Sequence, residues 1–155
     1  MNKLSFLILI IYFCQINSYA QKVKNDSLAI RETVADYIEG WYSGDTARIK
    51  MSLHSDLAKR GVLASRDGKG VDLVMSSYSE MIDWTGKNPN LIKENKVLKS
   101  DLKITIIEIG VNIANVKCVS NEYIDYLQLA RINNQWKILN AIWEFNYQEI
   151  MKMNK

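Results

Sequence analysis

Apolar and aromatic residues are densest near the end of the chain, in two runs separated by Asn133 and Asn134. These runs, residues 123–132 and 135–145, are rich in β-branched and aromatic side chains, which are typical of strands. An asparagine pair between two such runs predicts a hairpin with a tight turn. Because apolar residues occupy both alternating sets of positions, we expect both faces of the hairpin to be covered.

Two further runs with a strand period precede the hairpin, over residues 102–109 and 113–119, and they turn near Gly110. Together with the hairpin, these runs predict four consecutive antiparallel strands. The first half of the chain shows a different period, which is that of helices.

The first predicted helix begins at Asn25 or Asp26, either of which can cap it, and ends near Ser43. One apolar face at helical spacing is formed by Ile30, Val34, Tyr37, Ile38 and Trp41. Asp45 then caps a shorter second helix over residues 46–54.

A third helix is predicted over residues 78–85, because Ser77 and Glu80 have the spacing of a capping box and Gly86 can end the helix. The remaining segments are a short strand, a turn, a second short strand or helix lead-in, and a polar loop, at residues 57–64, 66–70, 71–75 and 87–99. Helices and strands are thus segregated along the chain, which favours an α+β fold over a doubly wound sheet.

The N-terminus has the pattern of a targeting segment. After a basic start at Lys3, residues 4–13 form an apolar run with the length of a signal-peptide core, too short to span a bilayer. Small residues stand at the −3 and −1 positions of a cleavage site before Gln21. We therefore expect a signal peptide at residues 1–20 and one domain over residues 21–155. The domain would be periplasmic or secreted, with no stable membrane insertion after cleavage.

Charge and cysteine content exclude several classes of function. The formal net charge is +3, and Lys3 is the only charged side chain that cleavage would remove, so the mature domain keeps a weak positive charge. Its lysines do not form the basic stripe that nucleic-acid binding needs. Cleavage would also remove Cys14 and leave Cys118 without a partner, as a small buried hydrophobe in a strand. His54 is the only histidine, so we expect no histidine-based metal site, and no motif indicates a cofactor.

Several short motifs along the chain resemble the putative lumazine-binding family of the nuclear transport factor 2-like superfamily. They are Trp41-Tyr42-x-Gly44-Asp45, His54, Gly61, Asp125-Tyr126-Leu127-x-Leu129 and Trp136-Lys137-Ile138-Leu139-Asn140, in this order. The resemblance covers residues 26–145. It implies a cone, in which three N-terminal helices pack in the concave face of a strongly curved antiparallel sheet and leave a pocket at the wide end. It also implies a homodimer through the convex sheet face.

Large rings and a few polar residues are the candidates for a site in this pocket. Aromatic walls with few polar groups are typical of sites for planar ligands. We expect the ligand-binding residues to be Trp41, Tyr42, His54, Tyr78, Trp84, Asp125 and Asn140. The alternative for each ring is that it only fills the core.

Asp125 and His54 are the candidates for proton transfer. Asp125 lies among apolar neighbours, and burial in the cone would raise the pKa of its carboxyl. Alternatively, Asp125 faces solvent at a strand end or bonds the backbone of a neighbouring strand. For His54, the alternative is a structural position at a helix C-terminus, where the helix dipole stabilises its positive charge. Asp36 is expected to be solvated and Tyr37 to belong to the core.

Asn140 and Glu144 share the predicted strand face of Trp136, Ile138 and Ile142, which places them at a pocket rim or a subunit interface. The first functional hypothesis is an exported, non-catalytic domain that binds a small, partly apolar molecule in a cavity of several hundred cubic ångströms. The alternatives are an isomerase- or dehydratase-like enzyme that uses Asp125 or His54, and a structural domain whose pocket is filled by its own rings.

Overall fold

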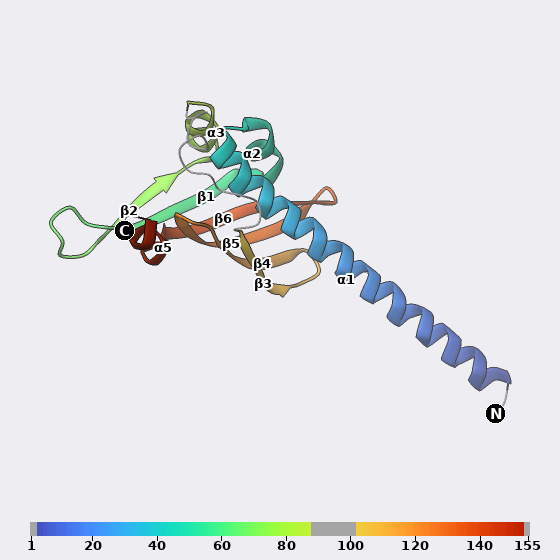
Figure 1. The fold of residues 1–155 in the computed structure, drawn as a ribbon. Coiled ribbons are helices and arrows are strands. Elements are labelled where there is room, and N and C mark those ends of the chain that lie inside the picture. The colour runs from blue at the N-terminus through green and yellow to red at the C-terminus, as the bar shows by residue number, and fades with distance from the viewer. Residues whose placement is uncertain (1–2, 88–101, 154–155) are drawn as a thin grey trace.

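The structure, a computed structural model, describes residues 3–87 and 102–153 (Figure 1). The chain runs from a long helix through a second helix, a β-hairpin and a third helix into four strands and a final short helix. The elements are α1 (Lys3–Ser43), α2 (Thr46–Ser52), β1 (Leu53–Ala64), β2 (Val71–Ser76), α3 (Tyr78–Lys87), β3 (Lys103–Ile109), β4 (Ile113–Val119), β5 (Tyr123–Ile132), β6 (Gln135–Phe145) and α5 (Tyr147–Met153). The segregation of helices and strands confirms the predicted α+β class.

The six strands form one open sheet in the order β2-β1-β6-β5-β4-β3. The last four strands are antiparallel, as predicted. The predicted wholly antiparallel sheet is nevertheless wrong at one position, because β1 pairs with β6 in parallel. Strands β2 to β5 lie between β1 and β6 in the chain, so no hairpin joins these two strands. A long connection of this kind permits parallel pairing.

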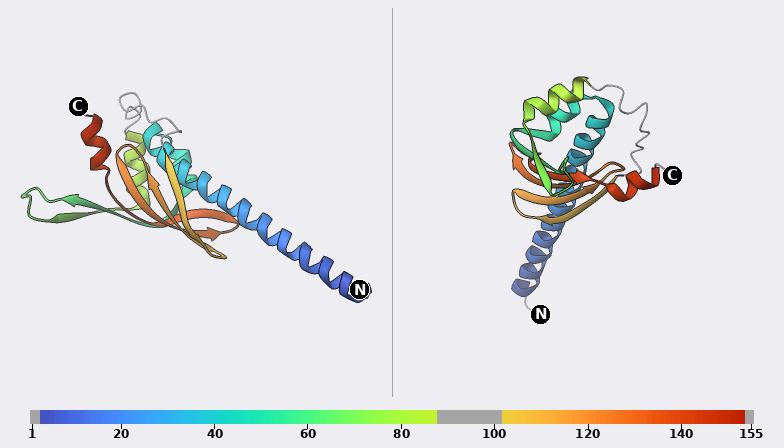
Figure 2. Two further views of the ribbon diagram at one scale, coloured as in Figure 1. Left: turned by 60° about the horizontal axis from the view of Figure 1, so that its bottom comes forward. Right: turned by 90° about the vertical axis from the view of Figure 1, so that its left-hand side faces the viewer.

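The sheet curves around the C-terminal half of α1, and α1, α2 and α3 all lie on its concave side (Figure 2). Irregular pairing between β1 and β6, β3 and β4, and β5 and β6 marks bulges, which bend and twist a sheet locally. The core lies between α1 and the sheet, where Ile30 and Val34 of α1 pack with Leu127, Leu129 and Ile138. The cone implied by the family resemblance is therefore present, although its sheet does not close.

Helix α1 does not begin at Asn25 or Asp26, so that predicted start is wrong. Asp26 instead forms an ion pair with Arg131 and accepts a hydrogen bond from Nε1 of Trp136 at 3.4 Å. These contacts fasten α1 to the β5–β6 hairpin. Within the described part of the chain, no helix has the length and apolarity that crossing a membrane requires.

Apart from the predicted start of the first helix, the local signals for turns and caps are confirmed. Asn133 and Asn134 have φ of 49° and 62°, the left-handed backbone that a tight hairpin turn needs. The side chain of Asp45 accepts hydrogen bonds from two N–H groups at the start of α2. Ser77 and Glu80 form the expected capping box, and α3 continues one residue past Gly86.

Three segments differ from the prediction. Helix α2 ends at Ser52 rather than near residue 54, because Leu53 is already extended and starts β1. Helix α5, at residues 147–153, was not predicted from the sequence. Most of the predicted loop at residues 87–99 lies outside the described residues.

Candidate functional site

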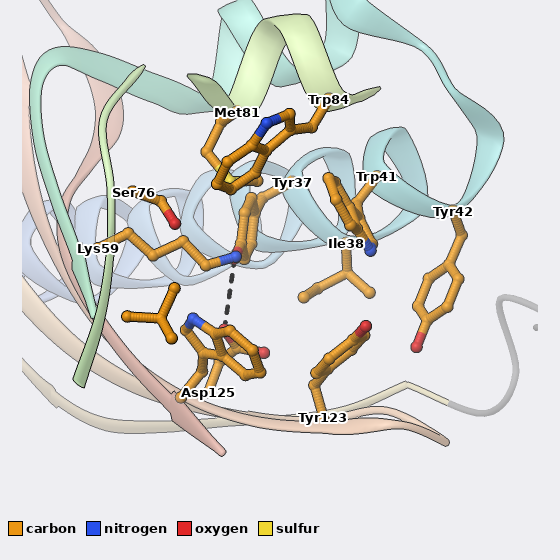
Figure 3. A pocket seen from close by; sticks show the side chains of 12 residues that line it. Tyr37, Ile38, Trp41, Tyr42, Lys59, Ser76, Met81, Trp84, Tyr123 and Asp125 are labelled. Carbon is orange, nitrogen blue, oxygen red and sulfur yellow. Dashed lines mark hydrogen bonds between the residues drawn. The ribbon is translucent and has the colours of Figure 1, made fainter. Parts of the chain in front are cut away.

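A cavity of about 180 Å³ lies on the concave side of the sheet, between α1, α3 and strands β1, β2, β5 and β6 (Figure 3). Six of its lining side chains are aromatic and two are charged. The lining residues are Tyr37, Ile38, Trp41, Tyr42, Lys59, Val74, Ser76, Met81, Trp84, Tyr123, Asp125 and Trp143. The cavity is smaller than the several hundred cubic ångströms expected, because these rings occupy much of the cone.

Helical and strand periods bring these side chains together. On α1, Tyr37, Ile38, Trp41 and Tyr42 recur at three- and four-residue spacing and share one face. On β5, Tyr123 and Asp125 are two residues apart and point to the same side of the sheet. Asp125 is paired with Trp143 of β6, which brings the carboxyl and the indole to one wall.

Gly61 of β1 makes room for that indole. It is paired with Trp143, and a Cβ atom at Gly61 would lie 2.5 Å from Cζ2 of Trp143 and 2.7 Å from its Cε2. Real Cβ contacts are not this short, so the indole can lie on the β1 backbone only because residue 61 lacks a side chain. Among the described residues, Nε1 of Trp143 is buried without a hydrogen-bond partner.

The aromatic side of the cavity continues into a cluster of rings. Tyr123 contacts Tyr42, Trp143 and Phe145, with ring centroids 6.3, 5.3 and 5.6 Å away. Offset and edge-to-face contacts of this kind fix the rings relative to one another. Tyr42 is also held by a 3.3 Å hydrogen bond between its hydroxyl and that of Ser120. This wall is therefore preformed rather than dependent on a ligand.

Lys59 reaches from β1 into the centre of the cavity (Figure 3). Its Nζ lies 5.2, 5.7 and 5.3 Å from the ring centroids of Tyr37, Trp41 and Trp143. The negative ring faces attract the ammonium, but burial lowers the pKa of Lys59 to about 8, an effect that Asp125 partly opposes. No acceptor among residues 3–87 and 102–153 is hydrogen-bonded to this nitrogen.

Asp125 lies at the base of the same cavity and is only 2% exposed. Burial raises the pKa of its carboxyl to about 6, while Lys59 and the Tyr37 hydroxyl act in the opposite direction. The Tyr37 hydroxyl donates to Oδ1 of Asp125 at 3.4 Å, a long hydrogen bond. A carboxyl with this pKa can hold or release a proton near neutral pH.

The structure brings together four of the seven predicted ligand-binding residues, since Trp41, Tyr42, Trp84 and Asp125 line the cavity. Trp84 is 36% exposed. Tyr78 is half-buried and packs against the core outside the cavity lining.

His54 and Asn140 lie elsewhere. His54 is in the irregular start of β1, where its Nδ1 accepts a hydrogen bond from the backbone N–H of Asp56 at 3.2 Å. It therefore neither ends a helix nor lines the cavity. Asn140 is exposed on the outer sheet face and donates to the side chain of Gln128 at 3.0 Å.

Sequence reasoning missed Lys59. In the final part of β1, Lys59 and Gly61 are two residues apart and thus share a face, so a strand period over this segment could have indicated a lysine beside the pocket. Tyr37 was assigned to the core, and it is buried there, but its hydroxyl also reaches Asp125. In the described part of the chain, no group of three or more His, Cys, Asp or Glu residues is arranged to hold a metal ion.

Comparisons with known proteins agree with this architecture. The model of the family described as "putative lumazine-binding" matches residues 25–144. No curated protein matches the chain in sequence. A nuclear transport factor 2-like protein from Silicibacter pomeroyi has a similar structure, with a TM-score of 0.61, 14% identity, and coverage of 80% of this chain and 98% of that chain.

Two structures from Novosphingobium are also similar. A nuclear transport factor 2-like protein with a cystatin-like fold from N. aromaticivorans has a TM-score of 0.58 at 14% identity, covering 83% of this chain and 87% of that one. A hexachlorocyclohexane dehydrochlorinase from N. barchaimii has a TM-score of 0.51 at 13% identity, covering 83% and 91%. At these identities the likeness shows the shared fold, which hosts both enzymes and other proteins.

Proposed function

Because the chain belongs to the putative lumazine-binding family, we propose that it binds a small, mostly apolar ring compound in the concave cavity, without catalytic turnover. The aromatic lining of this cavity is the observation that supports the proposal most directly. Its volume of about 180 Å³ is below the roughly 300–1,000 Å³ of drug-sized sites. It is close to the roughly 150 Å³ of an engineered apolar cavity that binds benzene. A ligand with one substituted ring fits these limits.

The polar part of the ligand would be a hydrogen-bond acceptor. Lys59 presents an ammonium to the cavity, and none of the described residues hydrogen-bonds to it. Lys59 is half-buried and faces the cavity, so an oxygen of the ligand would accept a hydrogen bond from it in place of solvent. The Asp125 carboxylate can accept a hydrogen bond and repels negative charge. It therefore favours a ligand that also carries a hydrogen-bond donor, or at least one that is not an anion.

A titration with benzyl alcohol tests this function. The hydroxyl can accept from Lys59 while the ring contacts Trp41 and Trp143, so tryptophan fluorescence should change and saturate. Trp41→Ala should weaken binding by at least about ten-fold, since a central aromatic contact is worth 1–2 kcal/mol or more. Ile142→Ala, on the outer sheet face, is the matched control and should bind like the unaltered protein. Native mass spectrometry of the purified protein would in addition report a small molecule that co-purifies.

Failure of both measurements would favour the alternative of a structural domain. In that case the rings around the cavity serve only to pack the cone. A saturable signal that is unchanged in Trp41→Ala would place the ligand somewhere else.

Acid–base catalysis by Asp125 is the second candidate function. Its support is a buried carboxyl that lies in the cavity, has a pKa near neutrality and is oriented by Tyr37. Such a group could remove a proton next to the carbonyl of a small cyclic ketone. Exchange of that proton for deuterium, followed by NMR, should then be faster with the protein than without it, and Asp125→Asn should abolish the effect. His54→Gln should leave it unchanged, because His54 does not line the cavity.

We also propose that the protein is exported and forms a homodimer through the outer sheet face. The signal-peptide pattern of residues 1–20 supports export. Exposed apolar side chains on the outer face support the dimer, notably Tyr126 and Ile142, which are 45% and 49% exposed. Sequencing of the mature N-terminus should start at Gln21. Sedimentation should show a dimer that Tyr126→Lys converts to a monomer, whereas Met51→Lys on α2, a similarly exposed residue away from the sheet, should not.

A further inference from the structure

The Lys59 amine differs from an ordinary surface lysine in both position and surroundings. Its Nζ is held over three rings at 5.2 to 5.7 Å, beside the Tyr37 ring in Figure 3. Asp125 lies in the same cavity and is bonded by the Tyr37 hydroxyl. A nucleophile and a proton-carrying group therefore share one small, largely apolar space.

We propose that Lys59 captures a small ring-bearing aldehyde as an imine inside this cavity, a proposal that rests on the cavity being a binding site. The ring of the aldehyde would occupy the space between Trp41, Tyr123 and Trp143. Its carbonyl carbon would then meet Nζ of Lys59, which no described residue holds in a hydrogen bond. Lysines that form such adducts are typically desolvated in apolar pockets.

Burial also supplies the reactive form of the amine. Only a neutral amine has the lone pair that attacks a carbonyl. Burial lowers the pKa of Lys59 to about 8, so about one side chain in ten is neutral at pH 7. For a lysine with an ordinary pKa the neutral fraction is below about one in a thousand. The cavity thus raises the concentration of nucleophile by about two orders of magnitude.

The adduct forms without an oxidant, a reductant or a cofactor. The nitrogen lone pair attacks the carbonyl carbon, and the carbonyl oxygen gains a proton as the nitrogen loses one, which gives a carbinolamine. The Asp125 carboxyl then donates a proton to the hydroxyl group, which leaves as water while the nitrogen lone pair forms the C=N bond. The amine and the aldehyde have become an imine and one water, and the carboxylate recovers its proton from the nitrogen.

Reductive trapping with benzaldehyde tests the proposal on the full chain. The protein is incubated with benzaldehyde and cyanoborohydride near neutral pH, digested, and the benzyl group on each lysine is quantified by mass spectrometry. Lys59 should be modified at least about ten-fold faster than Lys117. Lys117 is a matched reference, because its Nζ lies 5.2 Å from the Tyr126 ring centroid but on the outer face of the sheet.

Two further arms separate the inference from the function on which it rests. Benzyl alcohol, which fits the cavity but has no carbonyl, should compete and slow the modification of Lys59 without affecting Lys117. Asp125→Asn should slow trapping at Lys59, whereas Asp83→Asn, an exposed carboxyl outside the cavity, should leave it unchanged. Modification of Lys59 no faster than that of Lys117, with benzyl alcohol bound normally, would overturn the imine and leave the binding function standing. Absence of benzyl alcohol binding, together with no preference for Lys59 in the trapping experiment and no co-purified molecule, would overturn both.

Discussion

The two faces of the same sheet use similar residues in different surroundings. Asp125 and Tyr126 are neighbours on β5, yet the first is 2% exposed and the second 45%. Lys59 and Lys117 each lie over an aromatic ring, on the inner and the outer face. Only the inner lysine is enclosed by α1 and α3, and burial lowers its pKa to about 8. The helices, rather than the strand residues themselves, therefore turn an ordinary lysine–ring contact into a candidate site.

The outer face has a contrasting character. A shallow groove there is lined by exposed side chains from several strands, among them Arg60, Ile107, Tyr126, Gln128, Asn140 and Ile142. Apolar residues on both parities led us to expect that both faces are covered. In the single chain only the inner face is covered, so the outer apolar residues are available to a second copy, as proposed above.

Truncation of one aliphatic side chain on each face makes the comparison with the largest expected effect, which falls on the inner face. Leu127→Ala removes an inner side chain that is 1% exposed, and we expect a loss of about 2–5 kcal/mol in the free energy of unfolding. Ile142→Ala removes a side chain that is 49% exposed, and it should cost below about 1 kcal/mol in dilute protein. Denaturant titrations at low and high protein concentration make the comparison. A large cost for Ile142→Ala that appears only at high concentration would show that the outer face is buried in a dimer.

Addition of one methyl group tests the close contact that shapes the inner face. Gly61→Ala places Cβ within 2.5 Å of the Trp143 ring, so the indole must move toward the cavity. We expect a loss of about 1–3 kcal/mol and weaker ligand binding, as for other overpacked sites. Gly70→Ala is the control, because a Cβ there has no neighbour within 4 Å. Equal effects of the two substitutions in a denaturant titration would contradict the contact between Gly61 and Trp143.

The difference between the faces could be predicted from sequence only where the period is regular. The α1 spacing correctly placed Trp41 beside the cavity, and Asp125 followed from its apolar strand neighbours. Asn140 was grouped with Trp136 and Ile138, which is wrong, because it faces outward. The register of β5 and β6 shifts between Gln128 and Leu129, so β6 contains an extra residue and its inward parity changes. A strict alternation counted from Trp136 does not anticipate such a bulge, so it assigns the residues after the bulge to the wrong face.

A second irregularity explains the misplacement of His54. The step from Leu53 to Ala58 on β1 matches the shorter step from Ile138 to Asn140 on β6, so β1 carries extra residues that include His54. The apolar residues up to Leu53 keep helical spacing, so the sequence gives no sign that the helix ends before His54. The helix ends because Leu53 becomes extended and pairs with β6. Long-range pairing thus overrode a local pattern. The same pairing sets the face of Lys59, which is why the site's central residue was not found.

The buried carboxyl of Asp125 should make the stability of the protein depend on pH, whereas an exposed carboxyl should contribute little. Its folded-state pKa of about 6 is above the unfolded value of about 3.9, so the folded protein binds the proton more tightly between these values. Stability should therefore fall as the pH rises from about 4 to 6, by on the order of 3 kcal/mol from this group. Asp125→Asn should remove that part of the slope. Asp83→Asn, an exposed carboxyl paired with Lys87, should retain it in parallel denaturant titrations.

Removal of an outer polar group should have the smallest effect. Asn140 donates to Gln128 across β6 and β5, but both side chains are exposed, so water replaces the bond when it is lost. Asn140→Ala should change the free energy of unfolding by at most about 0.5 kcal/mol and leave benzyl alcohol binding unaltered. Tyr42→Phe, which removes a buried hydroxyl bonded to Ser120 at the cavity wall, should cost about 1 kcal/mol. A larger loss in the free energy of unfolding for Asn140→Ala than for Tyr42→Phe, in protein diluted to a monomer, would contradict the exposed position of Asn140. Weaker binding of benzyl alcohol by Asn140→Ala would contradict the assignment of the ligand to the inner face.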